Sequence, residues 1–206
     1  MTFNDWPWRH WRQRRGEALA LRLNNQPLTW RELCARVDAL ASGFAAQGVM
    51  EGQGVALRAY NQPETLLAWL ALLQCGARVL PLNPQLPAVL LQALLPALTM
   101  QHQLVLNGDV LPGNLPMLTL QLVEGEHAAC WHGDRLVSMT LTSGSTGLPK
   151  AAVHSANAHL ASAAGVLALM PFAAGDDWLL SLPFVPCLRS GDRLALAAGR
   201  RATHGT

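Results

Sequence analysis

Hydroxyl side chains, glycines and a lysine gather in one short segment of the chain, residues 139–155, which reads MTLTSGSTGLPKAAVHS. Hydroxyls and inward-turned backbone N–H groups donate hydrogen bonds to phosphate oxygens, and a lysine adds a point charge. Glycines allow this because no Cβ stands between the backbone and the ligand. The segment is therefore predicted to bind a polyphosphate through Thr142, Ser143, Gly144, Ser145, Thr146, Gly147 and Lys150.

The pattern differs from the Walker A loop, G-x-x-x-x-G-K-[ST], which also binds phosphates. Gly144 and Gly147 are only three positions apart. Pro149 precedes Lys150, and Ala151 stands where a Walker A loop has its metal-binding hydroxyl. Nothing in the sequence indicates a helix that begins at the lysine. The segment is therefore a phosphate loop of another kind.

Short apolar runs flank the loop on both sides, at residues 136–141 and 151–153. Both have the length and composition of β-strands. The plain alternative is that residues 142–150 form only a polar connection between two strands. A random connection rarely combines Ser-Gly-Ser-Thr-Gly with Pro-Lys, so the phosphate-binding interpretation is favoured.

The string T-S-G-S-T-G-x-P-K resembles the phosphate-binding loop of the adenylate-forming superfamily, which includes acyl-CoA synthetases, luciferases and the adenylation domains of peptide synthetases. Four further strings are similar to bacterial 2-succinylbenzoate–CoA ligases of the menaquinone pathway. This likeness covers residues 1 to about 183. The four strings are DWPWRHW at 5–11, TWREL at 29–33, LAWLALLQCGA at 67–77 and LPLNP at 80–84.

The resemblance implies the N-terminal portion of the large adenylate-forming domain, an α/β fold with a mostly parallel sheet flanked by helices. It also implies a two-step ligase reaction, in which ATP activates a carboxylate and coenzyme A then forms the thioester. The implied substrates are 2-succinylbenzoate, ATP and coenzyme A, with Mg²⁺ as counter-ion. The catalytic lysine of the family lies in a C-terminal domain that these 206 residues do not contain. The resemblance thus assigns phosphate-binding residues but no catalytic residue, and this chain is expected to be inactive by itself.

Two other functions remain open from the sequence. One is a different acyl- or aryl-CoA ligase of the same superfamily, because most of the acyl pocket of the family lies beyond residue 183. The other is a non-catalytic, nucleotide-binding remnant. A panel of carboxylic acids, tested as substrates of the intact gene product, distinguishes another acyl- or aryl-CoA ligase from a 2-succinylbenzoate enzyme. Calorimetry with ATP and Mg²⁺ tests whether the chain is a nucleotide-binding remnant.

Composition limits the partners. The chain is 50% hydrophobic and 14% charged, with a formal net charge of +2, which gives no strong attraction to nucleic acid. The four cysteines are scattered without a C-x-x-C pair, which suits a reducing compartment. The histidines lack the spacing of helical metal ligands, so no metal site is expected. With neither an apolar leader nor an apolar run long enough to span a bilayer, a cytoplasmic location is expected. The oligomeric state is left open.

Strand and helix patterns alternate along the chain, which favours an α/β fold with a largely parallel sheet. Loops are expected at 108–116 and 124–134. The expected strands are 18–24, 55–59, 78–82, 104–106, 118–122, 136–141 and 177–182, with a turn at 24–27. The expected helices are 3–15, one from Thr29 to about Gly48, 63–75, 87–100 with an interruption at Pro96, and 157–170.

Two of these helices carry specific expectations. The helix in residues 3–15 is expected to bury Trp6, Trp8 and Trp11 and to leave its arginines in water, although a basic, Trp-rich helix can also lie on a membrane. The next helix should begin with a capping box of Thr29 and Glu32. Its buried face should comprise Leu33, Val37, Leu40, Ala41 and Phe44.

Residues 184–206 depart from the pattern of the family, so the chain is predicted to consist of 1–183, the N-terminal part of the AMP-binding domain, and an aberrant tail. The family continues after this strand with a Pro-x-Phe-His type motif, which is absent here. Codons can be chosen for Pro186 to Gly199 that, with the first base dropped, encode His-Val-Ser-Gly-Gln-Gly-Ile-Val-Trp-Arg-Trp-Leu-Gln. That string restores the missing histidine, which indicates a frameshift near residue 184 in the gene or in its sequencing.

We expect the DNA beyond codon 184 to contain, in another frame, the rest of an adenylate-forming enzyme. Resequencing the locus checks this, and a downstream frame that encodes a Tyr-x-Thr-Gly-Asp stretch is the expected result. If no frame encodes such a stretch, the frameshift explanation is wrong.

Overall fold

The structure is a computed structural model that describes residues 3–142, 150–170, 176 and 179. Three expectations fall on residues outside this description. They are residues 143–149 of the predicted phosphate loop, most of the strand expected at 177–182, and the tail at 184–206.

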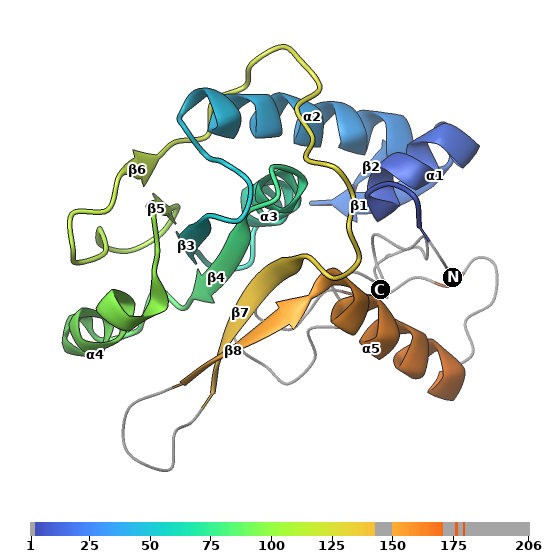
Figure 1. The fold of residues 1–206 in the computed structure, drawn as a ribbon. Helices are drawn as coiled ribbons and strands as arrows, with labels where there is room; N and C mark the ends of the chain where they lie inside the picture. Colours follow the sequence, from blue (N-terminus) through green and yellow to red (C-terminus); the bar gives the residue numbers. More distant parts are fainter. Residues whose placement is uncertain (1–2, 143–149, 171–175, 177–178, 180–206) are drawn as a thin grey trace.

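The core of the fold is a six-stranded sheet in the order β6-β5-β3-β4-β7-β8 (Figure 1). Every neighbouring pair is parallel except β7 and β8, which are antiparallel. This confirms the predicted α/β class with a mostly parallel sheet. In sheet order, the strands are β6 (Met117–Leu118), β5 (His102–Val105), β3 (Gly54–Arg58), β4 (Arg78–Leu82), β7 (Leu136–Thr142) and β8 (Lys150–Ser155).

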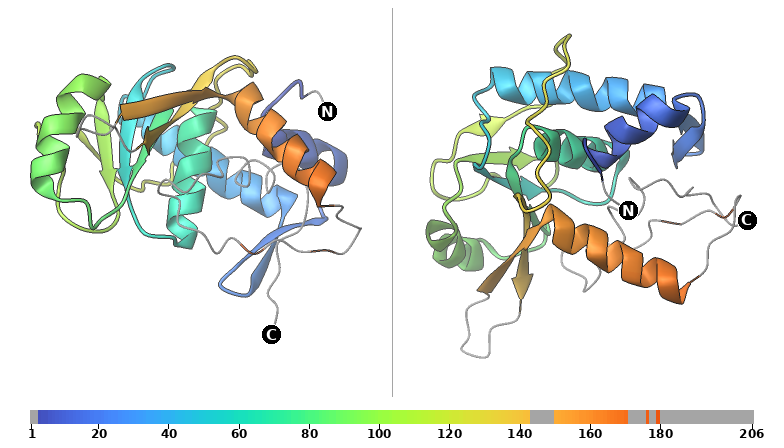
Figure 2. Two further views of the ribbon diagram at one scale, coloured as in Figure 1. Left: turned by 90° about the horizontal axis from the view of Figure 1, so that it is seen from below. Right: turned by 45° about the vertical axis from the view of Figure 1, so that its right-hand side comes forward.

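Helices lie on both sides of this sheet (Figures 1 and 2). On one side, α3 (Pro63–Gln74) lies between the sheet and α2 (Trp30–Ala46), which explains why α3 is apolar on nearly all sides. On the other side lie α4 (Ala88–Leu94) and α5 (Ala156–Leu169). The alternation of strand side chains divides the core accordingly: Val55 and Leu57 join the cluster under α3, whereas Ala56 joins the cluster at α4.

Local signals placed the ends of several elements correctly. The capping box of Thr29 and Glu32 is present at the start of α2, and the predicted face of that helix is buried. Gly48, with φ of +90°, follows the end of α2 in the left-handed conformation that favours glycine. The helix expected at 87–100 is interrupted at Pro96 as predicted: α4 is followed by a 3-10 turn, Leu95–Leu98, because Pro96 cannot continue the α-helical hydrogen bonds.

Two expected elements are shorter than predicted. The turn after β1 (Leu19–Leu23) consists only of Asn24 and Asn25, which both have positive φ, and β2 (Gln26–Thr29) begins at once. Two such residues form the tight turn that suits a right-twisted hairpin. Strand β6 covers only two residues, and residues 119–122 continue outside the sheet.

The N-terminal helix α1 (Pro7–Arg15) packs on the domain, and Trp6 and Trp8 are buried as expected. The expectation is wrong for Trp11, which is only partly buried. The expectation that its arginines stay in water is wrong for Arg9 and Arg12. Both guanidinium groups bind Asp38, at 2.9 Å and 2.8 Å, and Asp38 is only 2% exposed. A buried carboxylate needs such partners, because leaving water costs a lone charge several kcal/mol.

Gln74 of α3 completes this buried network. Its side-chain nitrogen donates to Asp38 at 2.7 Å and to the carbonyl oxygen of His127 at 2.8 Å. Its side-chain oxygen accepts from the indole nitrogen of Trp8 at 2.7 Å. Three helices and the segment that leads to β7 are therefore joined by hydrogen bonds around one carboxylate.

Asp38→Ala is expected to destabilise the chain by about 3–5 kcal/mol, because it leaves two arginines and Gln74 without their shared acceptor. Urea unfolding followed by tryptophan fluorescence measures this. The control is Glu17→Ala, which removes the partner of Arg31 in an exposed ion pair and should change stability little. Equal effects of the two substitutions would show that the buried network around Asp38 contributes no more to stability than an exposed ion pair does.

Candidate functional site: the hairpin that carries the phosphate loop

Strands β7 and β8 form an antiparallel hairpin whose last registered pair is Thr142 and Lys150 (Figure 1). The predicted strand–loop–strand arrangement is therefore confirmed for both flanks of the phosphate loop. A strand, and not a helix, begins at Lys150, which separates this loop from the Walker A type. Between these two ends, Ser143, Gly144, Ser145, Thr146 and Gly147 lie outside the described residues.

Thr142 and Lys150 are both exposed at the end of the hairpin. The hydroxyl of Thr142 donates to the backbone carbonyl oxygen of Lys150 at 3.1 Å. Its proton is thus already used, so Thr142 must give up this bond before it can donate to a phosphate oxygen.

Lys150 is the only lysine in the sequence. In the part of the chain that the structure describes, no carboxylate forms an ion pair with it. Its charge is therefore available to a ligand.

The hairpin end lies at the edge of the sheet where ligands bind in α/β proteins. Strands β3, β4, β5 and β7 are parallel, so their carboxyl ends share one edge, and open parallel sheets bind ligands at that edge. Arg58, at the end of β3, is 5% exposed and donates to the carbonyl oxygens of Pro84, Leu86 and Asp109. It thereby holds the segments that follow β4 and β5 together at this edge, a role that no sequence pattern indicated.

A second contact missed by the sequence analysis lies at the base of the hairpin. The hydroxyl of Ser138 on β7 and Nε2 of His159 on α5 are 2.6 Å apart, and both residues are buried. His154 of β8 is registered opposite Ser138, and its ring centroid lies 5.6 Å from that of His159. His154 therefore belongs to this basal cluster, four residues from Lys150.

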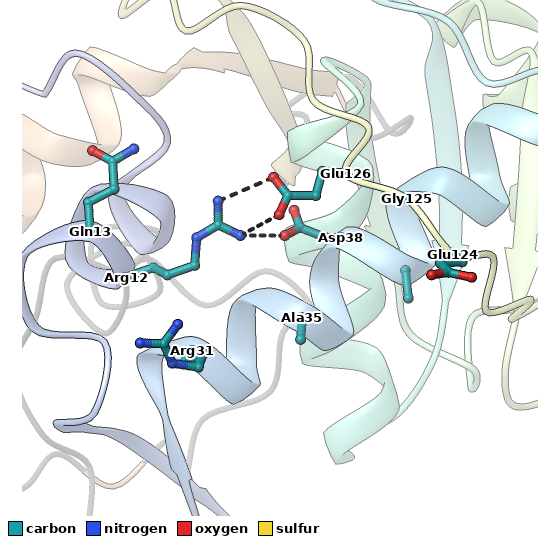
Figure 3. A pocket seen from close by; sticks show the side chains of 9 residues that line it. Arg12, Gln13, Arg31, Ala35, Asp38, Glu124, Gly125 and Glu126 are labelled. Carbon is teal, nitrogen blue, oxygen red and sulfur yellow. Dashed lines mark hydrogen bonds and ion pairs between the residues drawn. The ribbon is translucent and has the colours of Figure 1, made fainter.

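A pocket elsewhere on the molecule does not coincide with the predicted site. It is open and is lined by α1, α2 and residues 124–126 (Figure 3), whereas the hairpin end lies at the far side of the fold (Figure 1). Arg12 in this pocket is paired with Asp38 and with Glu126, whose pKa the hydrogen bond from Arg12 lowers. Because Arg12 is already paired with two carboxylates, this pocket is poorly suited to bind an anionic ligand.

Among the described residues, no three His, Cys, Asp or Glu side chains gather into a group that could hold a metal ion. None of the described helices combines the length and the apolar character needed to cross a bilayer.

Comparison with protein families gives one match over most of the chain. The sequence profile of the family described as "AMP-binding enzyme" matches residues 8–200. This range includes the whole sheet and the hairpin.

Curated relatives are similar over the same region. The 2-succinylbenzoate–CoA ligase of Escherichia coli (strain K12) is 71% identical over 183 residues, which are 89% of this chain and 41% of that protein. The enzyme of the same name from Salmonella typhimurium is 67% identical, again over 89% of this chain and 40% of its own length. The chain thus spans about 40% of the length of these relatives.

Solved structures show the same arrangement. Wild-type E. coli MenE with a bound phenylether-linked analogue of OSB-AMS has a TM-score of 0.92 at 63% identity, covering 98% of this chain and 45% of that chain. MenE from Bacillus subtilis in complex with the intermediate OSB-AMP has a TM-score of 0.86 at 20% identity, over 96% and 55% of the two chains. At 20% identity the second likeness concerns the fold alone.

Proposed function

The chain belongs to the AMP-binding enzyme family, and on that premise we propose that it is the N-terminal part of a 2-succinylbenzoate–CoA ligase. The observation that carries the proposal is the 71% identity to the E. coli enzyme of that name over 183 residues. The hairpin supports it, because an exposed lysine and an exposed threonine flank the predicted phosphate loop at the ligand-binding edge of the sheet.

The proposed reaction has two steps. The carboxylate of 2-succinylbenzoate attacks the α-phosphorus of ATP, the bond to the bridging oxygen breaks, and pyrophosphate leaves. The thiolate of coenzyme A then attacks the acyl carbon, and AMP leaves as the thioester forms. Both steps depend on positioning and on stabilising negative charge more than on covalent chemistry by the protein.

In this reaction the hairpin would bind the β- and γ-phosphates and later release pyrophosphate. The ammonium of Lys150 supplies a positive charge beside the phosphates, and the residues between Thr142 and Lys150 supply hydroxyl and backbone donors. Mg²⁺ would neutralise further phosphate charge, and it is held in such sites largely by the phosphates themselves with few protein ligands. The proposal therefore needs no dedicated cage of carboxylates.

The division of the chain at residue 183 is also part of the proposal. The alignment to the E. coli relative covers 183 residues, which agrees with the proposed length of the enzyme-like part, whereas the family profile continues to residue 200. The DNA sequence beyond codon 184 decides between an aberrant and a native segment there.

We expect ATP with Mg²⁺ to bind this chain weakly and to protect Lys150 from an amine-reactive reagent. Because Lys150 is the only lysine, mass spectrometry after acetylation reports on this amine alone, and the N-terminal amine serves as an internal reference. Lys150→Ala should weaken binding in calorimetry roughly 10- to 100-fold, as expected for loss of a charged hydrogen bond.

The matched control is Arg22→Ala, which removes an exposed cation from β1 without touching the hairpin. It should leave the affinity for ATP unchanged. Unaltered acetylation of Lys150 at saturating ATP, or equal losses for the two variants, would contradict the proposed phosphate site.

A further inference from the structure

Resting on the proposed function, we propose that Ser138 and His159 are positioning residues for Thr142 and Lys150, the two described ends of the predicted phosphate loop. Their hydrogen bond, within the protein and remote from the loop, sets where Thr142 and Lys150 stand relative to the sheet. Neither residue carries a phosphate-binding role in the proposed reaction. Both are buried, and the 2.6 Å between the Ser138 hydroxyl and Nε2 of His159 indicates a short hydrogen bond.

The hairpin is attached to the parallel sheet through a short contact between β7 and β4. Strand β7 pairs with the neighbouring strand β4 through one registered pair, Val79 and Ser138, whereas β3 and β4 share five such pairs. Among the described strands, β8 is last in the sheet order and pairs with β7 alone. Ser138 therefore lies at the point where the hairpin joins the parallel sheet.

Ser138 also connects the hairpin to the helix that follows it. Helix α5 begins at Ala156, directly after β8, and His159 lies in its first turn. The chain enters the hairpin past Ser138 and leaves it past His159, so their bond joins the two ends of the segment that contains the loop. His154, opposite Ser138 on β8, packs beside the ring of His159 and fills the same junction.

Further hydrogen bonds hold the outer side of this junction. The backbone nitrogens of Ala156 and Asn157 donate to the carbonyl oxygens of Arg135 and Gly133 at 2.9 Å and 2.7 Å. A Cβ on Gly133 would overlap the side chain of Asn157, so this approach is close. These bonds fix the start of α5 near the start of β7. They leave the direction of the hairpin to contacts farther along β7, where Ser138 lies.

A small rotation of β7 at Ser138 produces a large displacement of Thr142 at the end of the strand. Thr142 lies four residues farther along β7, which is roughly 13 Å of extended chain. A rotation of about 10° at Ser138 would move Thr142 by roughly 2 Å over that length. Displacements of about 1 Å are enough to impair a binding or catalytic arrangement. A buried hydrogen bond at the base of the hairpin can therefore determine the affinity for a phosphate ligand at the end of the hairpin.

The alternative is that the pair contributes only to stability, like any buried hydrogen bond. His102 on β5 provides the matched comparison, because its Nε2 lies 3.1 Å from the side-chain oxygen of Gln53 and the residue is 8% exposed. Strand β5 is separated from β7 by β3 and β4 in the sheet. Loss of the His102 contact should therefore affect stability without affecting the hairpin.

The test compares Ser138→Ala and His159→Leu with the control His102→Leu. The variant His159→Gln serves as rescue, because the glutamine nitrogen can occupy the place of Nε2. Two quantities are measured for each variant. Backbone amide hydrogen exchange is followed by mass spectrometry, and the affinity for ATP with Mg²⁺ is measured from the protection of Lys150 against acetylation as ATP is added. A variant that folds poorly is identified by faster exchange throughout the chain, and the other disrupting variant, Ser138→Ala or His159→Leu, then carries the comparison with His159→Gln.

We expect Ser138→Ala and His159→Leu to speed exchange about fivefold in peptides covering residues 139–142 and 150–155, with His159→Gln close to the parent chain. We expect the same two variants to bind ATP about fivefold more weakly. His102→Leu should change neither the hydrogen exchange of the hairpin nor the affinity for ATP. Equal exchange in the hairpin for all variants, or unchanged ATP affinity in Ser138→Ala, would falsify the positioning role. If the parent chain binds no ATP, the phosphate site proposed for this chain fails, and the exchange of the hairpin alone decides whether the pair positions it.

Discussion

The arrangement of the helices depends on one buried carboxylate. Asp38 is 2% exposed, and such a group is tolerated inside a protein only when its charge and its lone pairs are satisfied. Arg9 and Arg12 of α1 neutralise the charge, and Gln74 of α3 supplies a further donor. Because these partners come from different elements, α1, α2 and α3 can meet around Asp38 in only one relative arrangement. The aromatic contacts of α1, such as Trp6 stacked on Trp8, then fill the space that this arrangement leaves.

The same network extends toward the candidate site. Gln74 donates to the carbonyl oxygen of His127 and accepts, through its backbone, from the nitrogen of Ala129. The indole of Trp6 also donates to the carbonyl oxygen of Ala129. These bonds fix the extended segment that runs into β7, so the entry to the hairpin is held by the N-terminal helix. The hairpin itself then depends on the junction at Ser138 and His159.

Several features could be predicted from the sequence because their causes are local. The capping box needs only Thr29 and Glu32 three positions apart, and Pro96 interrupts its helix wherever that helix lies. The hydrophobic face of α2 follows from residue spacing alone. The expectation for α1 was wrong about Arg9 and Arg12, since their partner Asp38 lies more than twenty positions away. The Ser138–His159 contact was missed for the same reason, because a serine in an apolar strand indicates no partner.

The sequence by itself predicted the class of the site. A phosphate ligand is recognised by donors on consecutive residues, so the string from Thr142 to Lys150 indicates its chemistry without reference to the fold. Only the tertiary structure decided where Thr142 and Lys150, the two described ends of that string, lie in the fold. The hairpin lies at the carboxyl edge of the sheet because β7 is parallel to β4, and it is held there by a helix that follows it and by a serine at its base. Those contacts join residues that are distant in the chain, and residue spacing carries no information about them.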